Sequence, residues 1–189
     1  MNKIEKSDEL GEFYRMNIAG VERKLPICKV NDELSIAAFV IFGDVELTCA
    51  CASALIKKIP EHDIMIAAEA KSIPLIHEMA RQMGVNSYII ARKVSKLYMK
   101  NPINVEVHSI TTAGTQRLYI DEVEAKKMDG KHVLIVDDVI SSGESVKAVE
   151  KLVQSANGII VGKAAILAEG DAIKRDDIVV LEELPLFFK

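Results

Sequence analysis

The sequence predicts an α/β fold in which a mainly parallel sheet is covered by helices. From about Asp63 onward, short apolar runs alternate with stretches of helical periodicity, which is the pattern of parallel strands joined by crossover helices. The apolar runs are nearly continuous, as expected for strands buried on both faces. One of them leads through two acids and a small-residue turn into a helix. We therefore expect a twisted parallel sheet that carries a ligand site.

The core elements follow in order along the chain. Ser72 at the N-cap, Pro74 in the first turn and Gly84 just past the end predict a helix over Ile73–Met83. The predicted strands are short, apolar segments, and they lie at Asp63–Ala68, Ser87–Ala91, His132–Val136, Ile159–Leu167 and Ile178–Leu181.

Two regions lie outside this core pattern. Within residues 100–131, Val105–Ile110 and Arg117–Ile120 predict a long hairpin. Ahead of the core, Phe13–Phe42 contains strand-like runs and Leu47–Lys58 is helical in pattern. We expect a single domain of residues 1–189, with a small N-terminal part over about 1–60, a core over about 61–170 and a C-terminal part over about 171–189.

Composition narrows the class of protein. The formal net charge of -4 is spread along the 189 residues, so we expect no nucleic-acid partner. The cysteines Cys28, Cys49 and Cys51 have no CxxC spacing, which predicts neither a disulfide framework nor a zinc site. The N-terminus is unlike a signal peptide, and no apolar run approaches the ~18 residues of a membrane span. A cytoplasmic protein that does not bind membranes is expected.

The segment His132–Lys147, HVLIVDDVISSGESVK, predicts an anion site. A buried strand delivers its ligand at the carboxyl end, and the turn that follows leads into a helix N-terminus that suits a phosphate. Asp137 and Asp138 would repel a phosphate placed beside them, but ionised carboxylates accept hydrogen bonds from the vicinal hydroxyls of a ribose. The segment therefore indicates a ribose 5-phosphate. The sequence has no GxxxxGK[ST] or GxGxxG motif.

VDDVISSGES resembles the motif by which type I phosphoribosyltransferases bind 5-phosphoribosyl-1-pyrophosphate (PRPP). Asp137 and Asp138 match the acid pair, Ser142 and Ser145 the two hydroxyl positions, and Gly143 the glycine. The resemblance implies that fold, with a flexible hairpin lid and a small hood formed by the N- and C-terminal parts. It makes Asp137 and Asp138 catalytic and assigns PRPP binding to Val139, Ile140, Ser141, Ser142, Gly143, Glu144 and Ser145.

Two further segments are similar to the adenine phosphoribosyltransferase branch. AAEAKSIPLIHEMARQMG resembles the pyrophosphate loop and its helix, which implies that Ala70 and Lys71 bind pyrophosphate, with Lys71 where arginine is usual. It also implies a non-proline cis peptide at Ala70-Lys71. ARKVSKL resembles a basic stretch, which implies that Arg92, Lys93 and Lys96 face pyrophosphate near the interface of a homodimer. The positive charges would balance the leaving pyrophosphate.

The same resemblance implies a purine phosphoribosyltransferase for purine salvage, with adenine favoured and xanthine, guanine or hypoxanthine as alternatives. Magnesium would be held by PRPP and water, with no protein ligand. In the hairpin, Ser109–Gly114 stands where the adenine branch carries a glutamate thought to assist protonation of the base, and Thr112 takes its place. Glu106 is nearest but out of register. The candidate base pocket combines Leu25–Val30 with the C-terminal LEELPLFF.

Two other classes of protein are compatible with these residues. A PRPP-sensing regulator would keep the ligand site and do little chemistry, and Thr112 and Lys71 favour it. The first ~60 residues contain no basic recognition helix for reading DNA. A scaffold protein would have no need of the acid pair.

Overall fold

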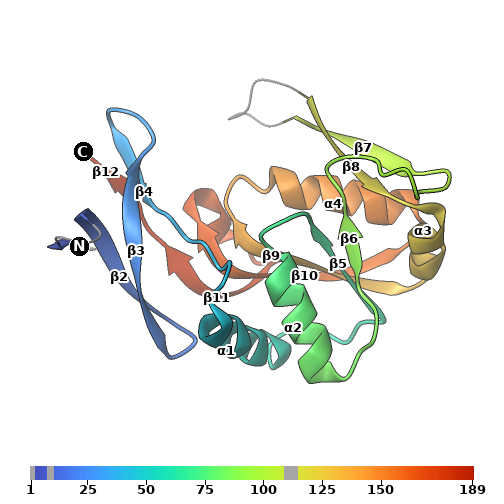
Figure 1. Cartoon of the computed structure of the whole chain (residues 1–189), viewed down its shortest axis with the longest axis horizontal. Coiled ribbons are helices and arrows are strands. Elements are labelled where there is room, and N and C mark those ends of the chain that lie inside the picture. The colour runs from blue at the N-terminus through green and yellow to red at the C-terminus, as the bar shows by residue number, and fades with distance from the viewer. Residues whose placement is uncertain (1–2, 8–10, 109–114) are drawn as a thin grey trace.

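The computed structural model describes residues 3–7, 11–108 and 115–189. Its centre is a parallel five-stranded sheet in the order β11-β10-β9-β5-β6, to which a smaller sheet is attached at one end (Figure 1). The core strands are β5 (Ile64–Ala68), β6 (Ile89–Ala91), β9 (His132–Ile140), β10 (Ile159–Glu169) and β11 (Val179–Leu184). The predicted fold class is confirmed.

Helices cover both faces of the core sheet (Figure 1). Alternate residues of β9 point to opposite faces, so that Leu134 and Val136 pack with α1 and α2, whereas Val133 and Ile135 pack with α3 and α4. Both faces are apolar, which explains why this strand reads as one continuous hydrophobic run. The helices are α1 (Val45–Ile56), α2 (Ile73–Met83), α3 (Glu122–Met128), α4 (Glu144–Ser155) and the short 3₁₀ helix η1 (Gly170–Lys174).

Helix α2 has the predicted bounds. Pro74 lies in its first turn, and Gly84 ends it with a left-handed φ of 68°. Ser72 occupies the N-cap position, but its side chain makes no capping hydrogen bond. The predicted capping role of Ser72 is therefore wrong, because its hydroxyl is used in the site described below.

The hood is an antiparallel sheet in the order β1-β2-β3-β4-β12. The C-terminal LEELPLFF is divided at Pro185, with β11 ending in the core sheet and β12 pairing with β4 in the hood. The C-terminal segment therefore connects the core sheet to the hood. The hood strands are β1 (Ile4–Ser7), β2 (Gly11–Ile18), β3 (Val21–Lys29), β4 (Leu34–Ala37) and β12 (Leu186–Phe188).

The predicted hairpin is formed by β7 (Ile103–His108) and β8 (Thr115–Ile120), which pair antiparallel. Its predicted tip, residues 109–114 with Thr112, lies outside the described residues. Helix α3 follows directly and was not predicted, although Asp121 and Glu124 form a capping box at its start. None of the helices in the described part of the chain is long and apolar enough to cross a membrane.

Candidate active site

The site lies where β9 extends beyond the end of one neighbouring strand, β5. On one side β9 pairs with β5 only as far as Val136, opposite Ala67, while on the other side β10 continues to pair through Ile140. β9 is therefore four residues longer than predicted, and Asp137 and Asp138 lie inside it rather than after it. Because β5 has ended there, the acid pair borders open space at the carboxyl edge of the sheet.

Asp137 is held by two hydrogen bonds to one carboxylate oxygen. Ser72 Oγ donates to Asp137 Oδ1 at 2.7 Å, and the backbone N–H of Asp138 donates to the same oxygen at 2.9 Å. Burial, and then the charge of the adjacent Asp138, raise the pKa of Asp137. A ligand that brings hydrogen-bond donors to this pair would favour the ionised form.

Asp138 is buried, with 5% of its surface exposed. Lys71 Nζ lies 3.2 Å from Asp138 Oδ2, but the geometry of this ion pair is not that of a hydrogen bond. Asp138 Oδ2 is thus the one fully buried side-chain polar atom in the described residues that has no hydrogen-bond partner. An unsatisfied buried oxygen at the edge of a cavity is suited to a ligand hydroxyl.

The loop after the acid pair ends at Gly143, the N-cap residue of α4. Gly143 has a left-handed φ of 77°, which glycine adopts without strain. The N-cap residue supplies no side-chain cap, and the Glu144 N–H donates to Ser142 Oγ in a long hydrogen bond of 3.5 Å. The next N–H groups in the first turn of this twelve-residue helix are therefore available to an anion.

The other residues between the acid pair and α4 differ in whether their side chains are accessible to a ligand. Ser141, Ser142 and Ser145 are exposed. Ile140 is 1% exposed and packs in the core, so only its backbone is available to a ligand. Glu144 forms an ion pair with Lys147 at 2.9 Å.

One cavity of about 260 Å³ joins these groups. The structure brings half of the predicted site residues to it, seven of fourteen, and these come from three separate segments. Predicted residues that line it are Ala70, Lys71, Lys93, Asp137, Asp138, Val139 and Ser145. Ala68, Glu69, Ser72 and Leu118 also line it and were not predicted.

Only one residue of the predicted basic stretch, Lys93, lines this cavity. Arg92 instead donates to Glu69 Oε1 at 3.1 Å and to Tyr98 Oη at 3.0 Å. The Lys93 backbone N–H also donates to Glu69, and this bond, more than the charge of Arg92, lowers the pKa of Glu69. Lys96 is half-buried outside the lining. Glu69 thus holds the basic stretch beside the cavity.

A non-proline cis peptide is present in the predicted pyrophosphate loop, at Glu69-Ala70. The prediction placed it at Ala70-Lys71 and was wrong by one residue.

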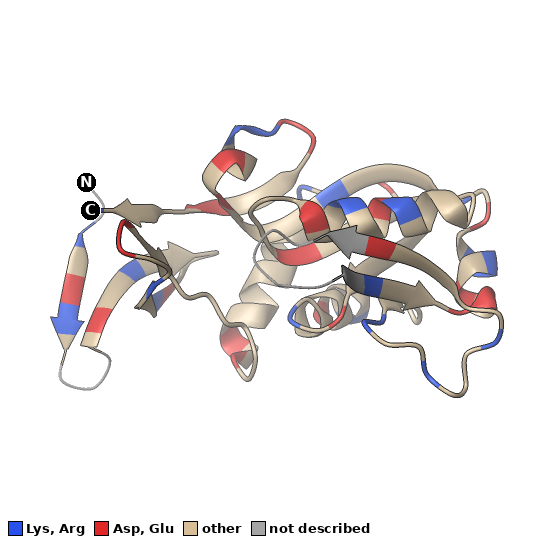
Figure 2. Cartoon of the chain, turned by 90° about the horizontal axis from the view of Figure 1, so that it is seen from above, with Lys and Arg blue, Asp and Glu red and all other residues tan. Residues whose placement is uncertain are grey.

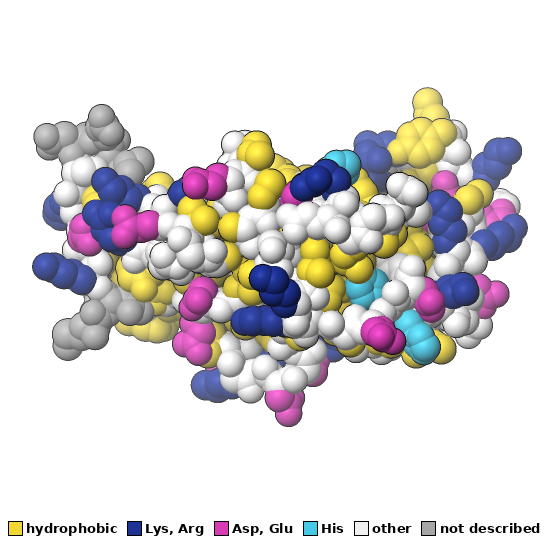
Figure 3. Space-filling view, turned by 90° about the horizontal axis from the view of Figure 1, so that it is seen from below, with side chains coloured by type: hydrophobic (Ala, Val, Ile, Leu, Met, Phe, Trp, Pro, Cys, Tyr) yellow, Lys and Arg dark blue, Asp and Glu magenta, His cyan; other side chains and the backbone are white. Residues whose placement is uncertain are grey.

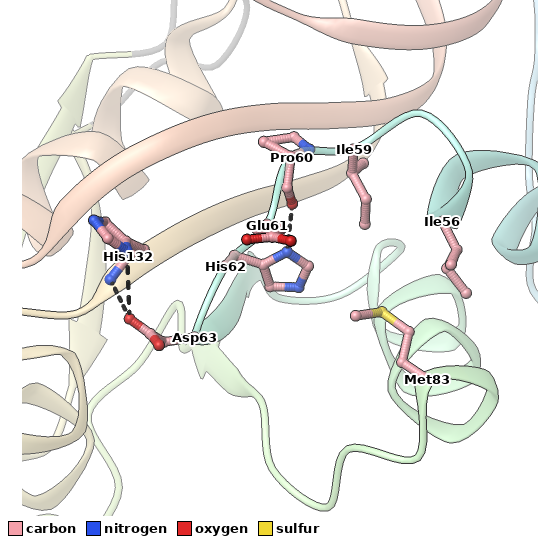
Figure 4. Close-up of a pocket in the computed structure, with 8 residues that line it drawn as sticks. All are labelled: Ile56, Ile59, Pro60, Glu61, His62, Asp63, Met83 and His132. Carbon is pink, nitrogen blue, oxygen red and sulfur yellow. Dashed lines mark hydrogen bonds and ion pairs between the residues drawn. The ribbon is translucent and has the colours of Figure 1, made fainter.

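A larger cavity, of about 450 Å³, lies at the opposite end of the sheet (Figure 4). It borders the start of β5 and β9, and two of its polar side chains are paired: Asp63 Oδ2 accepts from the His132 backbone N–H at 2.8 Å, and His62 Nδ1 contacts the Pro60 carbonyl at 2.9 Å. Ligands of α/β sheets bind at the carboxyl ends of the strands. The smaller cavity is therefore the candidate active site.

Similarity to known proteins shows the family of this chain. The family model described as "Phosphoribosyl transferase domain" matches residues 47–186. The chain belongs to the phosphoribosyltransferase family. The predicted family and its enzyme class, pentosyltransferase, are thereby confirmed.

Individual relatives differ in the base that they are named for. An adenine phosphoribosyltransferase of Rhodococcus jostii is 33% identical over 128 residues, 67% of this chain and 69% of the relative. A hypoxanthine/guanine phosphoribosyltransferase of Methanocella paludicola is 30% identical over 112 residues, 59% of this chain and 54% of the relative. The relatives support a purine phosphoribosyltransferase and do not select the base.

The fold is shared with solved structures. The crystal structure of an adenine phosphoribosyltransferase from Thermoanaerobacter pseudethanolicus has a TM-score of 0.63 to this chain at 24% identity, covering 76% of this chain and 84% of that one. The predicted type I phosphoribosyltransferase fold is confirmed.

Proposed function

We propose that this protein transfers the 5-phosphoribosyl group of PRPP to a purine base, with adenine favoured, and releases pyrophosphate. The observation that carries the proposal is the continuity of Asp137 and Asp138 with the uncapped N-terminus of α4, in one cavity with Lys71 and Lys93. Carboxylates for ribose hydroxyls, helix N–H groups for a phosphate and cations for pyrophosphate are the groups that PRPP requires.

In the reaction, a purine ring nitrogen forms a bond to the anomeric carbon of the ribose. The bond from that carbon to the pyrophosphate oxygen breaks with its electron pair going to pyrophosphate, and the proton displaced from the base nitrogen passes to the released pyrophosphate or to water. The residues 139–145 hold the 5'-phosphate, mainly through backbone N–H groups and the hydroxyls of Ser142 and Ser145. Asp137 and Asp138 hold the ribose hydroxyls and favour the positive charge that develops on the ring.

The pyrophosphate end is assigned to Ala70, Lys71 and Lys93. Lys71 is held by Asp138 at 3.2 Å, so pyrophosphate would have to share or take its ammonium group. Arg92 and Lys96 contribute from farther away, since Arg92 is paired with Glu69. The sequence prediction assigned all five residues to pyrophosphate without ranking them.

The site fits a magnesium ion that is held mainly by the substrate. Among residues 3–7, 11–108 and 115–189, no three His, Cys, Asp or Glu side chains form a group that could hold a metal, while the unsatisfied Asp138 Oδ2 could accept from a ribose hydroxyl or from metal-bound water. Magnesium would neutralise part of the charge of the leaving pyrophosphate.

A homodimer is part of the proposal. Val94, Leu97 and Tyr98 are exposed apolar residues on the connection between β6 and β7, and Tyr98 contacts Arg92 of the candidate site. Hydrophobic side chains protrude at the core end of the molecule (Figure 3). A second copy that covers them would lie close to the basic stretch.

We retain the predictions of a cytoplasmic enzyme with no nucleic-acid or membrane partner. Lysines and arginines are interspersed with acidic residues (Figure 2). Mixed signs along the chain differ from the clustered basic residues that support nucleic-acid binding.

The proposal is tested by mixing the protein with PRPP, Mg²⁺ and each of adenine, guanine, hypoxanthine, xanthine and orotate, and by measuring pyrophosphate release and nucleotide formation. Turnover with at least one purine and none with orotate is expected. PRPP binding without turnover would overturn the enzyme and favour the PRPP-sensing regulator. Absence of PRPP binding would overturn both.

A further inference from the structure

Glu169 is a carboxyl group at the site edge to which the proposed reaction gives no role. It is the last residue of β10, and the two residues before it, Leu167 and Ala168, pair with Val139 and Ile140 of β9. Glu169 therefore leaves the sheet at the same carboxyl edge as the loop that follows the acid pair.

The hood begins beside Glu169. The next residue, Gly170, lies so close to β12 that a Cβ atom built on it would be 3.5 Å from Leu186 Cδ1. Glu169 itself pairs with Leu184 at the end of β11, just before the chain crosses into the hood. Its position is the junction of the core and the hood.

The Glu169 carboxylate has no assigned partner. It is half-buried, and within the described part of the chain no hydrogen bond or ion pair engages it. Burial raises the pKa of Glu169, and the nearby charge of Lys71 lowers it to a smaller extent. In the strand register Glu169 comes one residue after Ala168, which pairs with Ile140, and Ile140 is two residues beyond Asp138. Glu169 therefore lies along the same edge of the sheet as the acid pair, and its pairing with Leu184 places it toward the hood.

The chemistry of the substrates leaves one partner for this group. The phosphate and pyrophosphate of PRPP are anions that a carboxylate repels, and the ribose hydroxyls already have Asp137 and Asp138. The remaining reactant is the base, which must lie beyond the anomeric carbon. On the basis of the proposed function, we infer that Glu169 faces the purine base and selects for an exocyclic amino group.

The selection follows from hydrogen-bond chemistry. An ionised carboxylate only accepts hydrogen bonds, so it favours an amino group and repels a carbonyl oxygen at the same place. Two matched pairs of bases differ in this respect. Adenine and hypoxanthine carry amino and oxo groups at position 6, and guanine and xanthine carry them at position 2.

The experiment compares kcat/KM within each pair for the wild type, Glu169→Gln and Glu169→Leu. The wild type should prefer the amino base in at least one pair. Glu169→Gln should lower that preference roughly tenfold or more, because a carboxamide can donate to the oxo group. Glu169→Leu, which neither donates nor accepts, should also lower it.

Glu61→Gln is the matched control. Glu61 is an exposed glutamate beside the cavity at the opposite end of the core sheet, so its substitution should leave the ratios unchanged. Unchanged ratios in both Glu169 variants, or a wild type that prefers the oxo base in both pairs, would overturn this inference alone. No turnover with any base would overturn the proposed transferase and this inference with it.

Discussion

At the scale of single residues, Ser72 shows how a tertiary contact displaces a local one. A serine at an N-cap normally accepts from the second or third helical N–H. Here its hydroxyl donates instead to Asp137 Oδ1, 65 residues away in the sequence, and α2 begins without a side-chain cap. The bond lowers the pKa of Asp137 against the larger effect of burial. Ser72 therefore orients the acid pair.

Asp137→Asn is expected to stabilise the unliganded protein in a pH-dependent manner. Burial and the charge of Asp138 raise the pKa of Asp137 from 3.8 to about 7. A raised pKa favours the protonated form, so the stability contributed by Asp137 is fully present below pH 3.8 and is lost as the pH rises through about 7. Asparagine is neutral throughout. Its advantage in the free energy of unfolding should be small near pH 4 and reach on the order of 1–2 kcal/mol at pH 8, where it appears as a higher Tm.

The measurement is thermal unfolding across this pH range, with Asp171→Asn as control because the Asp171 side chain is 98% exposed. A lower Tm for Asp137→Asn at pH 8 would contradict the prediction.

The acid pair is also predicted to bind the ribose of PRPP. The double variant Asp137→Asn/Asp138→Asn should bind PRPP roughly tenfold or more weakly in calorimetry, since it loses charge-assisted hydrogen bonds. An unchanged affinity for PRPP would contradict the assignment of Asp137 and Asp138 to the ribose hydroxyls.

At the scale of elements, the turn between β9 and α4 depends on Gly143 and Arg175. A Cβ atom on Gly143 would lie 2.8 Å from Arg175 Nη1. That guanidinium group is held by Asp177, to which its Nε and Nη2 donate at 2.8 and 2.7 Å. The left-handed backbone therefore favours glycine at this turn, and a larger residue would also have to displace the end of the Arg175 side chain from Asp177.

Gly143→Ala should destabilise the protein by about 1 kcal/mol or more and weaken PRPP binding, because the turn must shift and the N–H groups of α4 shift with it. Thermal unfolding and PRPP calorimetry measure the two effects. Gly130→Ala is the control: Gly130 has a similar φ of 65°, open space around its Cβ position and no place in the site. It should lose stability and keep its PRPP affinity. Equal PRPP affinities for both variants and the wild type would contradict the proposed phosphate site.

At the scale of the whole molecule, the hood and core share one apolar cluster. Met16 and Leu25 of the hood pack in the same cluster as Leu134 and Val136 of β9. Phe39 and Ile41 are buried in it too, although the strand predicted there ends at Ala37. The division at about residues 60 and 170 remains a proposal, because α1, which precedes residue 60, packs with the core residues of this cluster.

Leu97→Asp should convert the proposed dimer to a monomer. Leu97 is fully exposed in the single chain, so the substitution removes an intermolecular contact without disturbing the fold. Size-exclusion chromatography with light scattering measures the mass, and Val123→Asp, at an exposed site on α3, is the control that should remain dimeric. A monomeric wild type would end the dimer proposal, and a dimeric Leu97→Asp would place the interface elsewhere.

Prediction from the sequence succeeded where adjacent residues carry the signal. The bounds of α2 follow from Pro74 and Gly84, and the family follows from the loop of residues 137–145, because these signals depend on local backbone chemistry. Helix α3 was missed although its capping box, Asp121 with Glu124, is readable in the sequence. Its length of seven residues gives little periodicity to detect.

The sequence by itself determined the α/β class, the family and the acid pair, since strand composition and a contiguous motif need no distant partner. Only the tertiary structure decided the partners of the site residues. Lys71 with Asp138, and Arg92 with Glu69, come from segments that meet because β5 lies between β9 and β6. Which basic side chain pairs with which carboxylate depends on the distances between segments that are far apart in the sequence, and only the fold sets those distances.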